Sequence, residues 1–589
     1  MRTVSQAYKE QMRKPIRNRS YVKIRFMQID VGAAADGQYV DNGHEYLSEW
    51  GSVDVQEYKS PFQYGSLETN RFILDGTMAM APDPGSQVTP TGFVSNKFDG
   101  GVRITRSFQD KHSFLGLTFR FDTHCGDYPT NMVIRYLNDG AVVDEFTVEP
   151  DAPVYVVERR IERMDGLEIE LNAMNLPGRR PRIESILYGI EKIFEVDRVE
   201  SVSQVSDVDP ISRRLPTETL EFSLLDYERE YDPDNTAGYW SYIDSKSPIY
   251  IAYGYELDDS SIEWLPYVRY ELSGRPMVAG QKAKFTASGL LDGMARTYYK
   301  ATFNSKTLYD MAVSVLEDAD LPLTASLEKP WVLDSSLKSV ITTGLLPIAT
   351  HKECLQLIAH AGCCKLYTDD NNVIHIEKMV IPETPEDITI DLNCDLGEPS
   401  VSKIEPLYAI NVKKYSYSFS DTASELHKSE ITVNGDTEFH AEFSAATSIT
   451  VSVSGATIKT QNIYAQAVDL ILTGSGTATV TVTGKSGTQN TSGAPVAVSE
   501  DARGETETLE NPLITTDTMR ATLAGHVSDY LKLRSAYTTD YRGNPEIQTG
   551  DLINMESPFT PQFPAVVLKH TIDFDGGLSG NMIAKAVIK

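Results

Sequence analysis

"YTTDYRGNPEIQTGDLINM", residues 537–555, is the first of two neighbouring stretches that decide the fold. Residues 543–545 (Gly-Asn-Pro) and residues 550–551 (Gly-Asp) predict two turns. An alternating strand over residues 552–555 follows directly. Turns this close to a strand start are typical of the rim of a β-barrel.

The second stretch, "AVVLKHTIDFDGGLSGNMIAKAVIK", covers residues 565–589. We expect a strand from Ala565 to Phe574 and a last strand from Met582 to Ile588. Between them, Asp575-Gly576-Gly577 is a hairpin signal. The chain is therefore expected to finish in an antiparallel β-hairpin.

Length and charge limit the class of protein. At roughly 150 residues per domain, 589 residues suggest about four domains. Asp and Glu number 83 against 54 Lys and Arg, which gives a net charge of −29 spread along the chain. Nucleic-acid binding by a basic face is not expected from this balance.

The five cysteines form no CxxC pair and no even-numbered framework. We interpret them as reduced core residues, with metal ligation as a minor alternative. The N-terminus has no apolar segment of the secretory type, and no stretch approaches 18 apolar residues. We expect the protein to be made and assembled in a cytoplasm.

Residues 1–20 form a basic arm with six cationic side chains against Glu10. Val4, Ala7, Tyr8 and Met12 fall near helical spacing, and a proline at position 15 should end that helix. The arm is either a solvated, frayed terminus or a segment that docks on an acidic neighbouring subunit.

The next region alternates like strands. "YVKIRFMQID" (residues 21–30) and "GSVDVQEY" (residues 51–58) begin a first β-barrel, predicted over residues 21–92 and 189–298. Strands with regular turn signals over residues 93–188, including the Asn138-Asp139-Gly140 turn, predict an inserted β-sandwich.

Helical periodicity is concentrated in residues 299–398. Residues 305–321 place five apolar side chains on one face, with Ser305 as a candidate N-cap, and residues 350–363 do the same. Two short strands joined by a loop at residues 369–372 follow. We predict a small α+β domain here.

The remaining sequence predicts a second barrel over residues 399–424 and 503–589, with a connecting helix over residues 515–537. A Ser/Thr/Gly-rich block at residues 425–502 alternates too regularly for a disordered linker and predicts a second inserted sandwich. The fold class is mainly β and multidomain, built of β-barrels and β-sandwiches with a small α+β domain.

Enzyme signatures are missing from the sequence. There is no G-x-S-x-G, no H-E-x-x-H and no phosphate-binding glycine loop, and His351 and His360 lie too far apart for a helical metal pair. One carboxylate cluster fails the EF-hand template, because its sixth and twelfth positions are Tyr231 and Ala237. We interpret it as a strand end with a polar loop. Its members are Asp226, Glu228, Glu230, Asp232 and Asp234. We expect no catalytic residues, no metal and no cofactor.

Aromatic side chains in the first sandwich give one binding hypothesis. Tyr128, Tyr136 and Tyr155 could stack on sugar rings of a host glycan, although tyrosines in strands more often pack in a core or across strands. Trp240 and Trp264 are expected in the core.

The order of these elements resembles the baseplate hub or tail-tip hub proteins of tailed bacteriophages. The resemblance covers residues 21–589 apart from the two insertions, and it rests on the helix "TLYDMAVSVLEDADL", the helix and hairpin "HKECLQLIAHAGCCKLYTDDNNVIHIEK", the connecting helix and the C-terminal motifs. The motif residues, to which the resemblance gives a structural role, are Gly543, Pro545, Gly550, Asp551, Gly576 and Gly577.

The resemblance implies two related barrels in one chain and a ring of three copies that matches a sixfold tail tube to a threefold tip. It implies a virion-tail location and, as partners, other copies of the chain, the tail tube or distal tail protein, the tape-measure protein and other tail-tip or fibre proteins. An acidic channel wall would let DNA slide without sticking, although the charge could equally serve solubility.

Two alternatives stay open at this point. In one, the sandwiches bind host saccharide and the barrels serve as a mount. In the other, weaker one, Asp226 and Glu228 belong to a glycan-cleaving enzyme. Because the final predicted strand closes at Lys589, we expect no appended lysin, peptidase or fibre.

Overall fold

The computed structural model of the chain describes residues 1–30, 33, 36–40, 93–95, 97–122, 126–236, 238–243, 246–319, 321, 329–379, 385, 388–391, 394–403, 407–498 and 504–587. The strand predicted at residues 51–58, with most of the first half of the predicted first barrel, lies outside these residues. In the described part, no helix is both long and apolar enough to cross a membrane.

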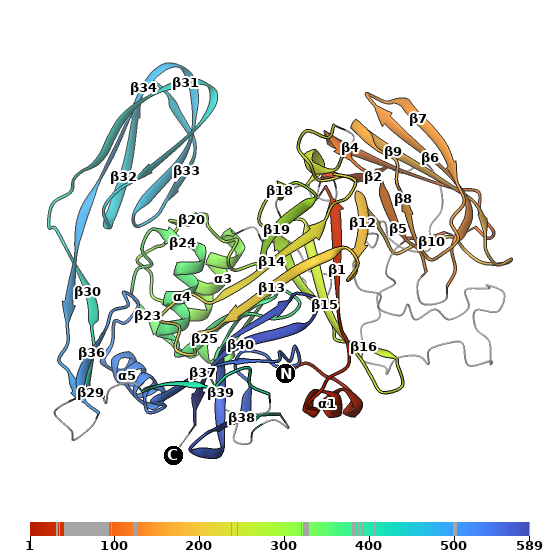
Figure 1. Cartoon of the computed structure of the whole chain (residues 1–589). Helices are drawn as coiled ribbons and strands as arrows, with labels where there is room; N and C mark the ends of the chain where they lie inside the picture. Colours follow the sequence, from red (N-terminus) through yellow and green to blue (C-terminus); the bar gives the residue numbers. More distant parts are fainter. Residues whose placement is uncertain are drawn as a thin grey trace.

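One 15-stranded sheet runs through the middle of the molecule (Figure 1). Its main path follows the order β12-β1-β15-β17-β19-β14-β13-β39-β40-β37-β28. We call the part up to β13 the first strand unit. It consists of β1 (Ser20–Ile29), β12 (Gly189–Phe194), β13 (Val199–Asp207), β14 (Thr217–Leu225), β15 (Pro248–Glu256), β16 (Ile262–Trp264), β17 (Val268–Leu272), β18 (Met277–Ala279) and β19 (Lys282–Ser288).

The second strand unit continues the same sheet. It consists of β27 (Thr389–Ile390), β28 (Ser400–Lys403), β37 (Ser535–Tyr541), β38 (Leu552–Ser557), β39 (Thr560–Phe574) and β40 (Leu578–Ala586). The path is open: β12 and β28 are its ends, and no ladder among the described strands closes a barrel. Strand β39 pairs with β13 of the other unit as well as with β38 and β40, and barrel closure stays a prediction.

The C-terminal hairpin confirms the local prediction. β39 ends at Phe574 and β40 begins at Leu578, so that Asp575, Gly576 and Gly577 form the turn. Inside it, the Asp575 N–H donates to the Gly577 carbonyl at 3.1 Å. Both strands begin before the predicted residues, since cross-strand pairing extends the ladder past the apolar residues, and β40 ends at Ala586.

The first inserted region has two facing sheets (orange in Figure 1). The larger has the order β2-β4-β9-β6-β7 and the smaller β11-β5-β8, with a separate β10-β3 pair. The bounds are β2 (Gln38–Val40), β3 (Phe93–Val94), β4 (Val102–Phe114), β5 (Leu117–Arg120), β6 (Pro129–Asn138), β7 (Ala141–Val148), β8 (Val154–Val157), β9 (Ile161–Met174), β10 (Arg182–Ile183) and β11 (Ser185–Leu187). Both sheets share one apolar core, which is the arrangement of a sandwich. Strand β2, expected in the first barrel, pairs with β4 here.

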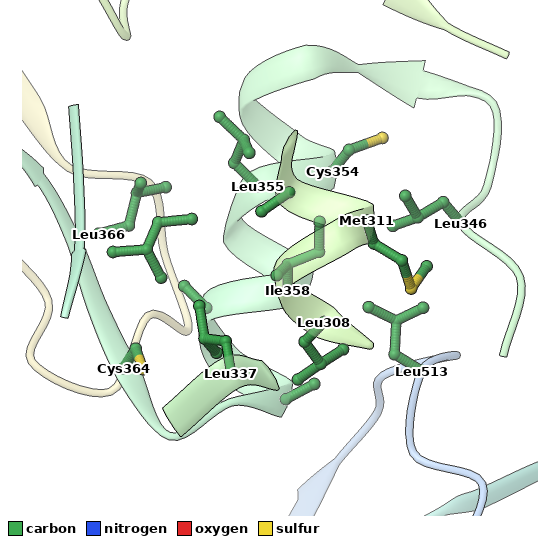
Figure 2. Close-up of a cluster of buried hydrophobic side chains, with 14 of the residues drawn as sticks. Leu308, Met311, Leu337, Leu346, Cys354, Leu355, Ile358, Cys364, Leu366 and Leu513 are labelled. Carbon is green, nitrogen blue, oxygen red and sulfur yellow. The ribbon is translucent and has the colours of Figure 1, made fainter. Parts of the chain in front are cut away.

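The helices gather around a separate apolar core (Figure 2). They are α3 (Leu308–Asp318), α4 (His351–Ala361) and α5 (Asp517–Leu531). The N-cap of α3 is Thr307, not Ser305, because the Thr307 hydroxyl accepts the Asp310 N–H. Thr350 and Glu353 form a capping box at the start of α4. Short strands surround the helices: β20 (Thr297–Tyr298), β21 (Lys306–Thr307), β22 (Trp331–Leu333), β23 (Ile341–Thr342), β24 (Ala349–Thr350), β25 (Cys364–Thr368), β26 (Ile374–Lys378), β29 (Leu407–Val412), β35 (Val496–Ala497) and β36 (Glu505–Leu509).

The Ser/Thr/Gly-rich block projects as a long β finger (Figure 1). It contains β30 (Lys414–Phe419), β31 (Ser424–Glu442), β32 (Ala446–Ser454), β33 (Thr457–Ile463) and β34 (Ala467–Ser492). Strand β34 pairs with β31 along one edge and with β32 and β33 along the other. The strands of the block are thus connected around one 26-residue strand and enclose an apolar core of their own, and the sandwich stays a prediction.

The N-terminal arm carries a short helix, α1 (Gln6–Arg13), which ends before Pro15 as expected. Tyr8 is fully buried, and its ring meets that of Tyr255 on β15 edge-on at 5.9 Å. The arm therefore packs on its own chain, which differs from both of our alternatives.

Candidate functional site: the junction of the two strand units

The two strand units meet where β13 pairs with β39. The antiparallel register runs from Val202 opposite Phe574 to Asp207 opposite Lys569. We call this β13–β39 ladder the seam. The side chains of Ile572 and Phe574 enter the apolar core of the first unit, so side chains as well as backbone cross the seam. A backbone ladder between two units fixes their relative orientation, because each hydrogen bond has a narrow range of geometry.

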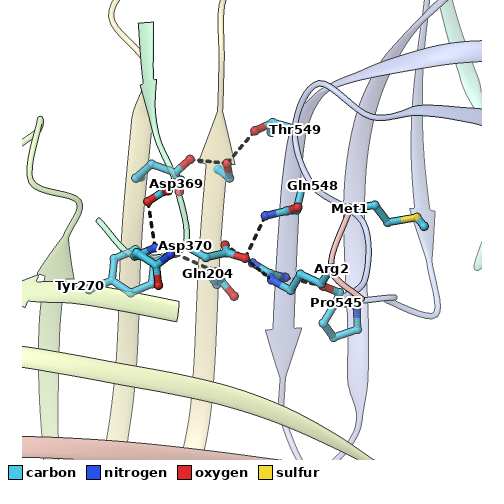
Figure 3. Close-up of polar contacts among 12 residues, drawn as sticks. Met1, Arg2, Gln204, Tyr270, Asp369, Asp370, Pro545, Gln548 and Thr549 are labelled. Atoms are coloured by element: carbon cyan, nitrogen blue, oxygen red, sulfur yellow. Dashed lines mark hydrogen bonds and ion pairs between the residues drawn. The ribbon is translucent and has the colours of Figure 1, made fainter. Parts of the chain in front are cut away.

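A polar cluster beside this seam brings four separate segments together (Figure 3). Arg2 of the arm donates from Nε and Nη2 to the two carboxylate oxygens of Asp370, both at 2.8 Å. Its Nη1 donates to the Pro545 carbonyl, and Gln548 Nε2 donates to Asp370 at 2.9 Å. The backbone carbonyl of Asp370 accepts the Arg269 N–H of β17 at 2.8 Å. We call this cluster, with the cavity beside it, the junction.

The motif turns predicted from the sequence supply one wall of the junction. Gly543 has φ +56°, and a Cβ there would meet the Ser579 carbonyl oxygen at 2.9 Å, so a glycine is required on two counts. Gly550 has φ +93°, and its N–H donates to the Val567 carbonyl of β39 at 2.7 Å. Asp551 then accepts the Gln548 N–H at 2.7 Å, which holds the Gln548 segment against Asp370.

A cavity of about 290 Å³ lies inside the junction and is lined largely by polar side chains. Glu218 of β14 faces it and accepts a hydrogen bond from the Ser206 hydroxyl, which also contacts the Thr549 hydroxyl at 3.1 Å. Burial raises the pKa of Glu218 to about 8, with Asp370 and Asp292 acting in the same direction. This carboxyl is therefore largely protonated at neutral pH, although part of its surface meets the cavity.

His570 of β39 also lines the cavity. Its Nε2 lies 2.6 Å from the Tyr541 hydroxyl. Burial, with the nearby Arg2 cation as a second cause, lowers the pKa of His570 to about 3. A neutral carboxyl and a neutral imidazole thus line the same cavity at neutral pH, so that the junction buries two titratable groups without their charges.

The arm bridges both units from outside. Lys9 lies 3.6 Å from the Glu546 carboxylate of the second unit, and the Ser5 N–H donates to Glu263 of the first at 2.7 Å. Arg17 Nη1 donates to the Arg542 and Gly543 carbonyls, both at 2.6 Å. The arm therefore links the two strand units through its side chains and backbone, and we call residues 1–20 with these contacts the clasp.

The predicted glycan-stacking tyrosines do not form an exposed group. Tyr136 is fully buried, packed edge-on against Phe114 at 6.1 Å, so its ring offers no face to a sugar; this part of the hypothesis was wrong. Tyr128 and Tyr155 are half-buried against the same core. Glycan binding by these two remains a prediction.

The carboxylate cluster at residues 226–234 has a local structural use. Asp226 is fully buried, and its two carboxylate oxygens accept the N–H groups of Glu230 and Tyr231 at 2.8 and 2.9 Å. It therefore pins a turn. In the described residues no group of His, Cys, Asp and Glu is arranged to hold a metal ion. The four described cysteines, Cys354, Cys363, Cys364 and Cys394, are buried and unpaired, while Cys125 lies outside the described residues.

Other placements differ from our expectations. The sequence suggests a surface residue and a flanking residue for His351 and His360, but both are buried. Trp240 and Trp264 are half-buried and lie under cations, with Arg275 4.4 Å from the Trp240 ring and Lys23 4.2 Å from the Trp264 ring. A tryptophan buried in a core and a tryptophan covered by a cation occur in the same kind of sequence context, so the sequence alone does not distinguish them.

No family model matches the chain, and no curated protein matches it. Among solved structures, the chain is similar to the 43 kDa tail protein of prophage MuSo2 from Shewanella oneidensis, with 11% identity and a TM-score of 0.36 over 67% of this chain and 95% of that one. A tail protein from Neisseria meningitidis MC58 has 8% identity and a TM-score of 0.36 over 67% and 93%.

The prophage tail protein gp18 from Listeria monocytogenes EGD-e has 9% identity and a TM-score of 0.35 over 67% of this chain and 91% of that one. All three are described as tail proteins, two of them from prophages. Because each TM-score lies below 0.5, the function is argued below from the chain's own residues.

Proposed function

We propose that the protein is a structural hub of a phage tail tip or baseplate and a component of the virion tail. The observation that carries the proposal is the seam, where the β13–β39 ladder joins two strand units into one sheet. The clasp and the junction reinforce the seam at residues far apart in sequence. Such a chain is suited to bear load and to hold two similar surfaces at a constant angle.

In the proposed assembly, three copies form a ring. Each copy contributes two strand units, so that six units surround one axis and match a sixfold tube to a threefold tip. Its partners would be other copies, the tail tube or distal tail protein, the tape-measure protein and other tail-tip or fibre proteins. A net charge of −29 suits a channel for DNA, because an acidic wall repels phosphate and does not retain the duplex.

We further propose that the chain works without catalysis. Its candidate acidic cluster is used in a turn at Asp226, and the neutral Glu218 and His570 serve the packing of the junction. The structural role needs rigidity, and buried neutral groups suit that purpose better than charged ones.

Light scattering over a range of concentrations, with negative-stain imaging of the same sample, tests the hub proposal. We expect a mass of three chains and threefold rings. The variant Asp370→Ala should weaken the ring because it loosens the junction, whereas Asp529→Ala, which alters an exposed ion pair with Lys532, should not. A chain that stays monomeric both alone and with the tail-tube protein of the same particle would contradict the proposal.

A further inference from the structure

A second cavity, of about 550 Å³, lies between the inserted sandwich and the first strand unit. From the sandwich it takes residues 113–115 at the end of β4 and Arg160, Glu162 and Arg163 around the start of β9. From the first unit it takes Asp30 after β1, residues 241–243 and Arg275. Its size falls in the usual range for small-ligand sites. We call it the groove.

Three arginines line the groove in a chain whose net charge is strongly negative. Arg160 pairs with Glu162 at 3.0 Å. Among the described residues, Arg163 and Arg275 have no carboxylate within ion-pair distance. Two cations without acidic partners leave charge available for an anionic ligand.

Two of the three arginines are held in place before any ligand arrives. The Arg275 guanidinium lies over the Trp240 ring and donates from Nε to the Ile243 carbonyl at 3.3 Å. The Arg160 guanidinium lies 4.6 Å from the centre of the Tyr242 ring. Stacking of this kind reduces the conformational entropy that an arginine loses on binding.

Arg163 adds backbone strain at the same place. It has φ +56°, in the left-handed region that non-glycine residues rarely adopt, and its N–H donates to the Ser113 hydroxyl at 3.0 Å. Strained residues of this kind persist where surrounding contacts fix them, and they concentrate at binding sites.

The rest of the lining distinguishes among anions. Phe114, Leu115 and Ile243 line the groove with apolar side chains. The carboxylates of Glu162 and Asp30 also line it; they contact Arg160 and His112, and their remaining lone pairs can accept further hydrogen bonds. A polyacidic peptide would be repelled by these two carboxylates. A sugar ring bearing an acid group has an apolar face, hydroxyl donors for the carboxylates and a charge for the arginines.

We propose that the groove binds an anionic oligosaccharide, with Arg163 and Arg275 holding its carboxylate or phosphate group. This binding goes beyond the hub role, and it does not involve the tyrosines at positions 128, 136 and 155. It makes the face between the sandwich and the first strand unit a site of contact with acidic glycan.

Fluorescence anisotropy of the full chain with labelled tetragalacturonate and with labelled phosphomannopentaose tests the proposal. We expect at least one to bind, more weakly as salt rises, and neutral maltotetraose not to bind. Arg163→Gly, which relieves the left-handed backbone, and Arg275→Gln should each weaken binding about tenfold or more. Arg103→Gln is the matched control, because Arg103 is an exposed sandwich arginine already beside Glu168 and Glu170.

Binding of neither acidic probe would overturn the proposal, as would equal binding of maltotetraose. Tighter binding of hexaglutamate than of both saccharides would overturn it in favour of an acidic peptide partner. Unchanged affinity in both groove variants would place the site elsewhere. Melting temperatures of all variants separate loss of binding from loss of folding.

Discussion

The apolar core around α3, α4 and α5 and the polar junction around Arg2 hold the chain together by different means. In the helical core, side chains such as Leu355 and Ile358 are fully buried among other hydrophobic groups (Figure 2). In the junction, contacts are charge-assisted and directional, as between Arg2 and Asp370. Burial supplies free energy with little directional preference, whereas the polar contacts fix how the strand units are oriented.

Leu355→Ala should have the largest effect on stability. The substitution leaves a cavity in a fully buried site and should cost about 3 kcal/mol of unfolding free energy. Leu396→Ala is the matched control, since Leu396 is 60% exposed, and it should cost less than about 0.5 kcal/mol. Urea unfolding of both variants measures the difference. If both variants lost the same unfolding free energy, burial of Leu355 in the helical core would contribute no more to stability than an exposed leucine does.

Asp370→Ala should cost less, about 2 kcal/mol, because it leaves the Arg2 guanidinium nearly buried without its carboxylate. Asp529→Ala removes the partner of Lys532 in a pair whose side chains are 76% and 69% exposed, and should change stability by less than about 0.5 kcal/mol. Thermal unfolding at low and high salt compares them. A junction pair as weak as the surface pair would contradict the role given to Arg2.

The junction should also make stability depend on pH. Glu218 has a folded pKa of about 8 against 4.5 for the free side chain, so its folded form binds more protons and stability falls as pH rises from about 4.5 to 8. His570 has a folded pKa of about 3 against 6.5, so stability falls as pH drops from about 6.5 to 3. The two slopes oppose each other between pH 4.5 and 6.5.

Glu218→Gln should remove the alkaline decline. Relative to wild type, the variant should gain stability between pH 4 and pH 9 by about 2 kcal/mol, less than the full pKa difference implies because the carboxyl meets the cavity. Glu438→Gln, at an exposed carboxylate on β31, gives the baseline. Calorimetric melting at each pH measures the gain; a difference that is constant with pH would refute the assignment.

Local features of this chain could be predicted from its sequence, and distant pairings could not. The turn at residues 575–577 and helices α3 and α4 depend on neighbouring residues and on spacing, and they were predicted with errors of a few residues. The mainly β, multidomain fold class with its α+β region is also confirmed.

No pattern in the sequence predicted the seam or the junction, because both depend on residues far apart along the chain. Strand β13 alternates like any other strand, and nothing in its pattern specifies residues 569–574 as partners. Arg2 and Asp370 lie 368 positions apart, and the sequence identified each only as part of an arm or a hairpin loop. His351 was misplaced because polar residues on a helix suggest exposure, whereas Asp318 and the Arg296 carbonyl satisfy it inside the protein.

The smallest expected effect comes from the backbone conformation of one turn residue, at a position that makes neither apolar core contacts nor polar junction contacts. Gly576 has φ +73° with open space around its Cβ position, whereas neighbouring Gly577 has equal space and no left-handed φ. Gly576→Ala should therefore cost about 1 kcal/mol, and Gly577→Ala close to nothing. Melting temperatures of the two variants test this, since neither alanine meets another atom. Equal temperatures would show that the turn relaxes freely and that the seam, with its core and junction contacts, sets the register of β39 and β40.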